Sequence, residues 1–250
     1  MKTKSAHLLT TIVVALGALA LLLNTLSTNA ASALTSSVTW TDDFDTSSLN
    51  SRWSWIREDA THWSLTARPG FMRISTQRGG FFGQGGDSKN MLLQKSPLGD
   101  FELQTRVIFA PTQNFQIAGL AVYQDDDNLF VLGRAYCDLI PSPCVGDGIY
   151  FDHKEQGSGI GSNFAMTTTA TGEAYLRLQR RGLVYTGYVS PDGTNWTTVG
   201  VHTVVSGMVP SKVGLVAHNS NTDAADIPAD FDFFTLIDSS HYLYLPLVRK

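Results

Sequence analysis

The sequence has few of the residues that build helices or nucleic-acid surfaces. Only four of its 22 acidic residues are glutamates, and no segment repeats apolar residues at a clear helical spacing. Its basic residues gather only in the short run "RLQRR", Arg177 to Arg181, and the formal net charge is −4. Nucleic acid and anionic lipid are therefore poor candidate partners, because both are bound through clustered positive charge.

The first 33 residues have the pattern of a secretory signal peptide. Two lysines precede an apolar run from Leu8 to Leu23, and an Ala-Ser-Ala triplet ends at Ala33. The run is shorter than the roughly 20 residues that a membrane-spanning helix needs. We expect cleavage after Ala33 or Ala30, which would leave a secreted or cell-surface protein without a membrane span.

Cysteine is nearly absent, since only Cys137 and Cys144 occur and they bracket "CDLIPSPC". A zinc site would need further Cys or His ligands nearby, and a catalytic thiol would be hard to keep reduced outside the cell. Export favours an oxidising compartment, so we predict one disulfide between them. A loop this short contributes about 2.5 kcal/mol in the chain-entropy model.

Apolar and polar residues alternate in almost every remaining segment. In "FELQTRVIFA", the apolar residues Phe101, Leu103, Val107 and Phe109 point one way, while Glu102, Gln104 and Arg106 point the other. Ten further segments show the same pattern: 71–75, 91–95, 117–124, 129–136, 148–154, 174–181, 183–190, 196–202, 212–219 and 230–237. Turns rich in Asp and Gly separate many of them. The pattern predicts one all-β domain over 34–238, a sandwich or a barrel.

Three segments stand apart from this pattern. The glycine-rich stretches 76–90 and 155–171 are expected to be binding loops or plain connections. Residues 239–250 form a C-terminal tail that ends in "HYLYLPLVRK". The tail fits either a sorting or surface signal or a terminal strand laid on the sandwich.

The order of the motifs resembles a known domain family. "FDTSSLNSRWSWIRED", "WSLTARPGFMRI", "LLQKSPLGDFELQTRVIF", "AGLAVYQDDDNLFVLG", "YLRLQRRGLVYTGYVSPDGTNWTTVG" and "KVGLVAHN" are similar to the concanavalin A-like domain that closes many bacterial β-xylosidases, and to its free-standing secreted relatives. The resemblance runs from Trp40 to Ile237. It implies a jelly-roll β-sandwich of two antiparallel sheets, which in the xylosidases is an accessory domain beside a catalytic propeller. Related folds include lectins and some glycoside hydrolases, so the fold alone does not decide function.

Carbohydrate binding requires aromatic faces and a few polar groups that fix the orientation of the sugar. Strand alternation selects Tyr123, Arg134, Tyr136 and His218 as candidates for the concave face, and Trp55 is a further stacking platform. Each of them also fits a plain structural role, as a buried aromatic or a satisfied polar residue. We predict a secreted, lectin-like module that binds xylan or a related glycan.

An extracellular glycoside hydrolase or lyase is the first alternative, and a non-enzymatic surface or matrix scaffold is the second. The Glu-x-Asp-x-x-Glu string that concanavalin A-like glucanases carry on one strand does not occur, nor does a Gly-x-Ser-x-Gly elbow. In "YFDHKEQ", the pleat separates Asp152 and Lys154 from His153 and Glu155. Asp152 and Glu155 therefore do not easily flank one glycosidic bond, and we predict no catalytic residue.

The resemblance also makes calcium a candidate cofactor. Concanavalin A-like folds often hold a structural calcium ion near the pairing of the first and last strands. Asp43 and Asp45 in "DDFD", and Asp230 and Asp232 in "ADFDFF", are plausible ligands there. The alternative is that these aspartates are solvated, with inward residues such as Phe44 between them.

Overall fold

The structure, a computed structural model, describes residues 34–81, 87–139, 144–159, 164–167, 172–220 and 224–243. The chain divides into two units, one spanning Thr35–Tyr242 and the other formed by the two termini. The predicted signal peptide, 1–33, lies outside the described residues, as does 244–250 of the predicted tail. The description below concerns the unit Thr35–Tyr242.

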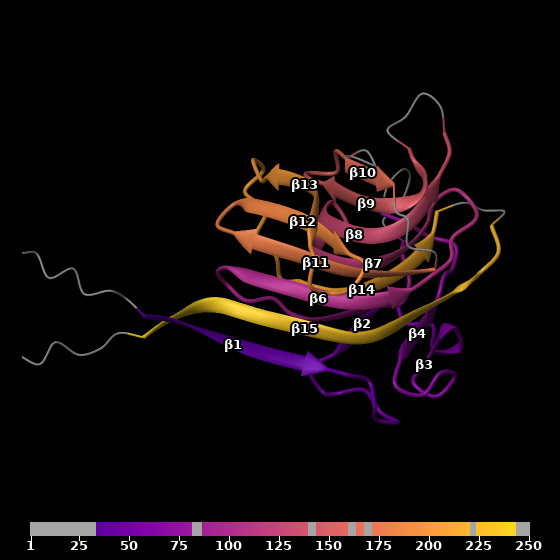
Figure 1. Ribbon diagram of the computed structural model, residues 1–250, viewed down its shortest axis with the longest axis horizontal. Coiled ribbons are helices and arrows are strands. Elements are labelled where there is room, and N and C mark those ends of the chain that lie inside the picture. Colours follow the sequence, from indigo (N-terminus) through magenta and orange to yellow (C-terminus); the bar gives the residue numbers. More distant parts are fainter. Residues whose placement is uncertain are drawn as a thin grey trace, which may run out of the picture. The chain divides into compact units, whose positions relative to one another are not determined.

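This unit consists of two antiparallel sheets (Figure 1). The eight-stranded sheet has the order β13 (Thr197–Thr203), β12 (Val184–Ser190), β11 (Glu173–Arg181), β6 (Phe101–Ile108), β15 (Pro228–Leu243), β4 (Met72–Ser75) and β3 (Trp63–Ser64), with β1 (Leu34–Asp42) paired to β15. The seven-stranded sheet has the order β10 (Phe164–Thr167), β9 (Gly146–Lys154), β8 (Asn128–Cys137), β7 (Gln116–Asp125), β14 (Lys212–Asn219), β5 (Met91–Lys95) and β2 (Ser54–Ile56). The predicted all-β sandwich is confirmed.

Every segment predicted from alternation forms a strand, and four further strands were not predicted. These are β1, β2, β3 and β10, of which β10 lies within the glycine-rich stretch 155–171. β2 and β3 contain three and two residues, too few to display a period of two. Apart from the strands, the described residues contain one short 3-10 helix, Ala60–His62. No described helix is long and apolar enough to cross a membrane.

The main core lies between the two sheets. Phe101, Leu103 and Val107 of β6 are fully buried there, as alternation predicted, together with Leu120 of β7 and Phe231 of β15. Each such side chain stabilises the fold by about 1.5–3 kcal/mol relative to its exposed state. The pleat therefore orients Glu102, Gln104 and Arg106 of β6 away from the core, whereas Thr105 points inward and donates its hydroxyl hydrogen bond to the carbonyl oxygen of Phe233.

Candidate functional site

The outer face of the seven-stranded sheet is covered rather than open. Tyr123 and His218 lie on this face, where their neighbours form a second buried apolar cluster that includes Leu93, Val131 and Val216. Phe81, from the segment after β4, belongs to the same cluster and packs edge-on against His218, with ring centroids 4.9 Å apart. The face that alternation selected for sugar contact is therefore occupied by the protein itself.

Burial withdraws both of these side chains from solvent. Tyr123 is 9 % exposed, and its hydroxyl donates a hydrogen bond to Asp126 Oδ1 at 3.0 Å. Burial raises the pKa of Tyr123 to about 12 and lowers the pKa of His218 to about 4. At neutral pH both groups are uncharged and packed, so neither is presented to a polysaccharide.

Arg134 and Tyr136 lie on the opposite face of the sheet, and the prediction that all four residues share one concave face is wrong. Alternation along β8 places Arg134 beside the core residue Leu132, so it points between the sheets. Arg134 is 1 % exposed and donates a hydrogen bond to the carbonyl oxygen of Glu173 at 3.1 Å. Tyr136 is half-buried at the end of the strand, and Trp55 is half-buried against Trp63. Their roles as stacking platforms stay predictions.

The four aspartates proposed as calcium ligands do not converge. Arg73 donates two hydrogen bonds to Asp230, at 2.6 and 2.8 Å, and another arginine binds the carboxylate of Asp232 at 3.2 Å. Asp43 and Asp45 are exposed beside the first strand. Within the described part of the chain they belong to no group of three metal-ligating side chains. Guanidinium groups thus hold two of the carboxylates, which corrects the calcium prediction for this set.

The aspartate-rich opening segment has a structural role instead. Asp42 accepts hydrogen bonds from the Trp53 indole N–H at 2.8 Å and from the Phe44 backbone N–H at 3.0 Å. Phe44 is buried in the main core, stacked on Trp53 with ring centroids 6.1 Å apart. The predicted inward orientation of Phe44, with Asp43 and Asp45 outward, is confirmed.

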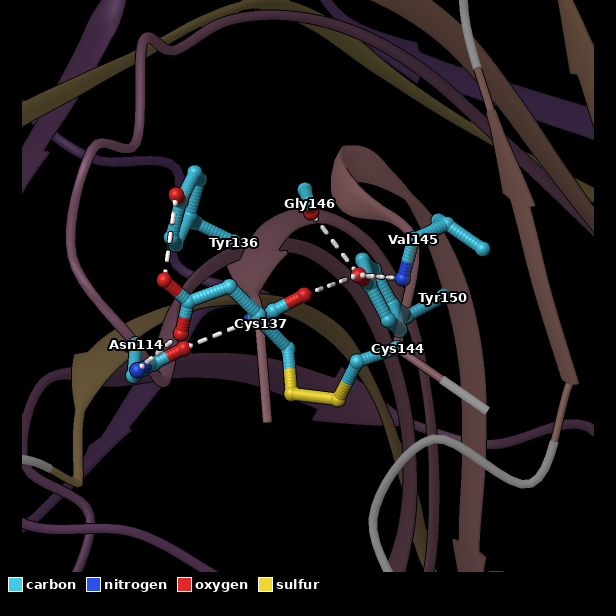
Figure 2. Close-up of a disulfide and its surroundings, with 8 residues drawn as sticks. Asn114, Tyr136, Cys137, Cys144, Val145, Gly146 and Tyr150 are labelled. Carbon is cyan, nitrogen blue, oxygen red and sulfur yellow. Dashed lines mark hydrogen bonds between the residues drawn. A yellow bond between two sulfur atoms is a disulfide. The ribbon is translucent and has the colours of Figure 1, made fainter. Parts of the chain in front are cut away.

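The predicted disulfide is present at the end of β8. Figure 2 shows Cys137 joined to Cys144 beside Tyr150 of β9. The Tyr150 hydroxyl donates a hydrogen bond to the Gly146 carbonyl oxygen at 2.8 Å and accepts one from the Val145 N–H at 3.0 Å. The bridge and the buried tyrosine together tie the end of β8 to the start of β9.

A groove of about 530 Å³ opens between β1 and β15 of one sheet and the end of β5 of the other. We call it the Trp40 groove. Its lining includes Trp40, Arg52, Gln94, Lys95, Leu98 and Asp238. An aromatic ring, hydrogen-bonding groups of both kinds and exposed apolar surface thus share one concavity.

Trp40 is held in the groove by aromatic contacts. It is half-buried, and its ring meets that of Trp53 edge-on, with centroids 5.6 Å apart. The guanidinium carbon of Arg52 lies 5.0 Å from the Trp40 ring centroid, within the range of a cation–π contact. The ring is therefore positioned before any ligand arrives.

Gln94 is the unusual polar residue of the groove. It is 3 % exposed, and its amide nitrogen Nε2 has no hydrogen-bond partner among the described residues. An unpaired buried donor costs about 1–3 kcal/mol, so it calls for an explanation. We did not select Gln94 from the sequence, although "MLLQK" places it on the same side of its strand as Leu92, where a glutamine is out of pattern.

A second polar group lies between the sheets, where β9 of the seven-stranded sheet faces β13 of the eight-stranded sheet. The imidazole rings of His153 and His202 stack with centroids 3.6 Å apart, and His202 Nε2 is hydrogen-bonded to Glu155. The other Glu155 oxygen accepts hydrogen bonds from the N–H groups of Val205 at 3.2 Å and Ser206 at 2.9 Å. Burial alone would raise the pKa of Glu155, but the hydrogen bonds from Ser206 and His202 outweigh it and lower the pKa to about 2.

Two of the three residues of this group were identified from the sequence. The pleat was predicted to place His153 and Glu155 on one face of β9, and β8–β9 register pairs His153 with the core residue Phe130, as that prediction requires. His202 lies 47 residues beyond Glu155 on a strand of the other sheet, and no local pattern connects the two.

Known proteins share this domain. The model of the β-xylosidase C-terminal concanavalin A-like domain matches residues 41–236. The non-reducing end α-L-arabinofuranosidase BoGH43B of Bacteroides ovatus is 29 % identical over 200 residues, covering 77 % of this chain and 36 % of that protein. A putative β-xylosidase of Escherichia coli is 29 % identical over 216 residues, covering 78 % and 38 %. The chain thus spans less than two fifths of the length of these relatives.

Solved structures show the same fold. The GH43 protein BlXynB of Bacillus licheniformis superposes with a TM-score of 0.68 at 22 % identity, covering 79 % of this chain and 39 % of that one. A functionally unknown protein of Saccharomyces cerevisiae superposes with a TM-score of 0.55 at 18 % identity, and the match covers 94 % of that protein. By its sequence match and by its two-sheet architecture, this chain belongs to the family of β-xylosidase C-terminal concanavalin A-like domains.

Proposed function

We propose that this protein is a secreted or cell-surface carbohydrate-binding module that retains xylan or a related glycan without cleaving it. The observation that carries the proposal is the Trp40 groove, in which a half-exposed indole lies beside a buried amide donor that lacks a partner. The names of the relatives, an arabinofuranosidase and a putative xylosidase, support a pentose-containing glycan as the ligand class.

The groove offers the two kinds of contact that sugars need. The indole of Trp40 can stack on the C–H-rich face of a pyranose or furanose ring. A sugar hydroxyl can accept the hydrogen bond that Gln94 Nε2 does not make within the protein, which removes the cost of burying that donor. Arg52 and Lys95 supply further donors at the rim, and a volume of about 530 Å³ accommodates a short oligosaccharide segment.

The shortage of carboxylates in the groove favours binding over hydrolysis. Glycosidases of both stereochemical classes use two carboxyl groups, roughly 5 Å apart or roughly 6.5–9.5 Å apart. The lining of the groove contains a single carboxylate, Asp238. A groove of this composition can orient a glycan but lacks the acid and base pair that cleaves it, so the hydrolase alternative is not favoured at this site.

The proposal is tested by measuring retention and cleavage together. The purified chain is run through gels that contain xylan, arabinoxylan or an unrelated glucan, and released reducing ends are assayed in parallel. We expect retention on a pentose-containing glycan and no release. Trp40→Ala is expected to weaken binding by about ten- to a hundredfold, as loss of a central tryptophan contact commonly does.

Tyr188→Ala is the matched control, because Tyr188 is also a half-buried aromatic but lies on β12, outside the groove lining. Circular dichroism checks that both variants fold. Retention lost in Tyr136→Ala or Trp55→Ala, but not in Trp40→Ala, would return the site to the residues predicted from sequence. Release of sugar would instead indicate an enzyme, and no retention on any glycan would indicate a scaffold.

A further inference from the structure

We propose that His153, Glu155 and His202 form a binding site for a zinc-class divalent cation that bridges the two sheets of the sandwich. The three side chains offer two imidazole nitrogens and one carboxylate oxygen, and these ligand atoms all lie within 4.8 Å of one another. No other group of three histidine, cysteine or acidic side chains converges in this way among the described residues. The inference is independent of the glycan-binding proposal.

The donor set selects the class of metal. Imidazole nitrogen suits zinc and the neighbouring transition metals, whereas calcium and magnesium prefer oxygen ligands alone. Two histidines and one glutamate are also a known ligand set for four-coordinate zinc, with the fourth position left to water. The chemistry of this site therefore differs from that of the aspartates near β1, which the resemblance associated with calcium.

Metal binding requires the three ligand atoms, now within 4.8 Å of one another, to move closer together. A tetrahedral ion with bonds of about 2.0–2.2 Å holds its ligand atoms about 3.4 Å apart. The stacked rings of His153 and His202 are tilted by 30° to each other, with centroids 3.6 Å apart. Stacked rings do not direct their in-plane lone pairs to one point, so metal binding requires both half-buried imidazoles to rotate about their side-chain bonds.

The backbone already positions the three ligands. His153 lies on β9 of the seven-stranded sheet, Glu155 follows the end of that strand, and His202 lies on β13 of the eight-stranded sheet. Ligands two residues apart on an extended chain point the same way, which explains the pair from β9. An ion held here would join strands that share no backbone ladder, so it would act as a cross-link between the sheets.

Contacts around the ligands resemble the support that metal sites usually have. The backbone N–H groups of Val205 and Ser206 hold one Glu155 oxygen and leave the other directed at His202. The ring of Phe130 lies beneath both imidazoles, with centroids 6.0 Å from His153 and 5.5 Å from His202. An apolar floor of this kind strengthens the attraction between a cation and its ligands.

Glu155 and His202 already tie β13 to the end of β9 through their hydrogen bond. A metal site needs a third ligand, and His153 supplies it, because its imidazole nitrogen lies within 4.8 Å of the ligand atoms of the other two residues.

The test is a zinc titration of the full chain prepared without a polyhistidine tag. The protein is stripped with a chelator, dialysed into metal-free buffer and titrated with Zn²⁺ against a competing chromophoric chelator. We expect one Zn²⁺ per chain. Because even outer-shell changes weaken metal sites by 10- to 100-fold, removing a ligand in His153→Ala or His202→Ala is expected to weaken binding by about a hundredfold or more.

His62→Ala is the matched control, because His62 also lies beside two carboxylates, those of Asp59 and Asp226, but belongs to no group of three. It should bind Zn²⁺ as the unchanged chain does. Glu155→Gln keeps the size of the side chain and an acceptor for the Val205 and Ser206 N–H groups, so it tests the ligand without removing packing. Equal zinc affinity in Glu155→Gln and the unchanged chain, or no stoichiometric binding at all, would overturn the proposal.

Discussion

Two places between the sheets, the Trp40 groove and the contact between β9 and β13, bring polar residues together in opposite ways. The Trp40 groove leaves the Gln94 amide without a partner. At the contact between β9 and β13, Glu155 uses both carboxylate oxygens and is bonded to His202. An unpaired donor needs an external acceptor, whereas converging ligands can share a cation, so the two places fit different kinds of ligand.

The largest effect should come from removing the floor of the β9–β13 contact. Phe130 is fully buried and stacks on Tyr185 with ring centroids 4.3 Å apart. Phe130→Ala is expected to lower the free energy of unfolding by about 3–5 kcal/mol, because it leaves a cavity under both histidines. Urea unfolding measures this, and the folded fraction should still bind glycan. Loss of glycan binding in that fraction would show that the two places are coupled.

The next effect concerns β15, the strand that lines the Trp40 groove. Asp230→Asn leaves the charges of two arginines without their carboxylate and should cost about 2–4 kcal/mol, less than for a wholly buried pair because both arginines are partly exposed. Burial by itself raises the pKa of Asp230, but hydrogen bonds from Arg73 and Arg68 outweigh it, so the pKa lies below its ordinary value of 3.8.

Because the pKa of Asp230 is lowered, the stability that its ion pairs provide should depend on pH. A carboxylate whose pKa is depressed in the folded state stabilises the fold above the unfolded value and loses that contribution as the pH falls through the folded value. The unchanged chain should therefore lose stability below about pH 3.8, and Asp230→Asn should lose less over the same range. Thermal unfolding from pH 7 to pH 2 measures both, and parallel curves would contradict the assignment.

Zn²⁺ should stabilise the fold through the site between β9 and β13, independently of the Trp40 groove. At a free Zn²⁺ concentration of 100 times its Kd, a site that exists only in the folded state adds about 2.7 kcal/mol to stability. The melting temperature of the unchanged chain should rise with Zn²⁺, that of His202→Ala should not, and that of Trp40→Ala should rise as in the unchanged chain. A rise in His202→Ala would place the ion elsewhere.

The smallest effect should come from changing Gln94, which we expect to raise the stability of the fold but to weaken glycan binding at the Trp40 groove. Gln94→Met has nearly the same shape but no unpaired donor, so we expect it to stabilise the fold by about 1 kcal/mol. The same change should weaken glycan binding, because the ligand loses a donor. Chemical unfolding and affinity electrophoresis on one preparation measure the two signs. Loss of stability together with unchanged binding would mean that Gln94 has a structural role only.

Most of the fold could be predicted because its information is local. Alternation in "FELQTRVIFA" identified the inward residues Phe101 and Leu103, and the pattern around Phe44 placed it in the core. The predicted export to an oxidising compartment, together with the presence of only two cysteines, led to the prediction of the bridge between Cys137 and Cys144. The sequence predicted much less about the candidate sites. Alternation divides the side chains of a strand between two faces, but it does not show which face the rest of the chain covers. Arg134 and His218 were assigned to a common surface for that reason.

By itself, the sequence determined that the chain forms antiparallel strands, which side chains within a strand share a face, and which domain family the chain belongs to. Only the tertiary structure decided that Phe81 covers the face of His218, that Gln94 meets Trp40 at a groove, and that His202 reaches Glu155. The physical reason is that alternation is a property of neighbouring residues, whereas a site depends on contacts between strands of different sheets, which the packing of the whole domain sets.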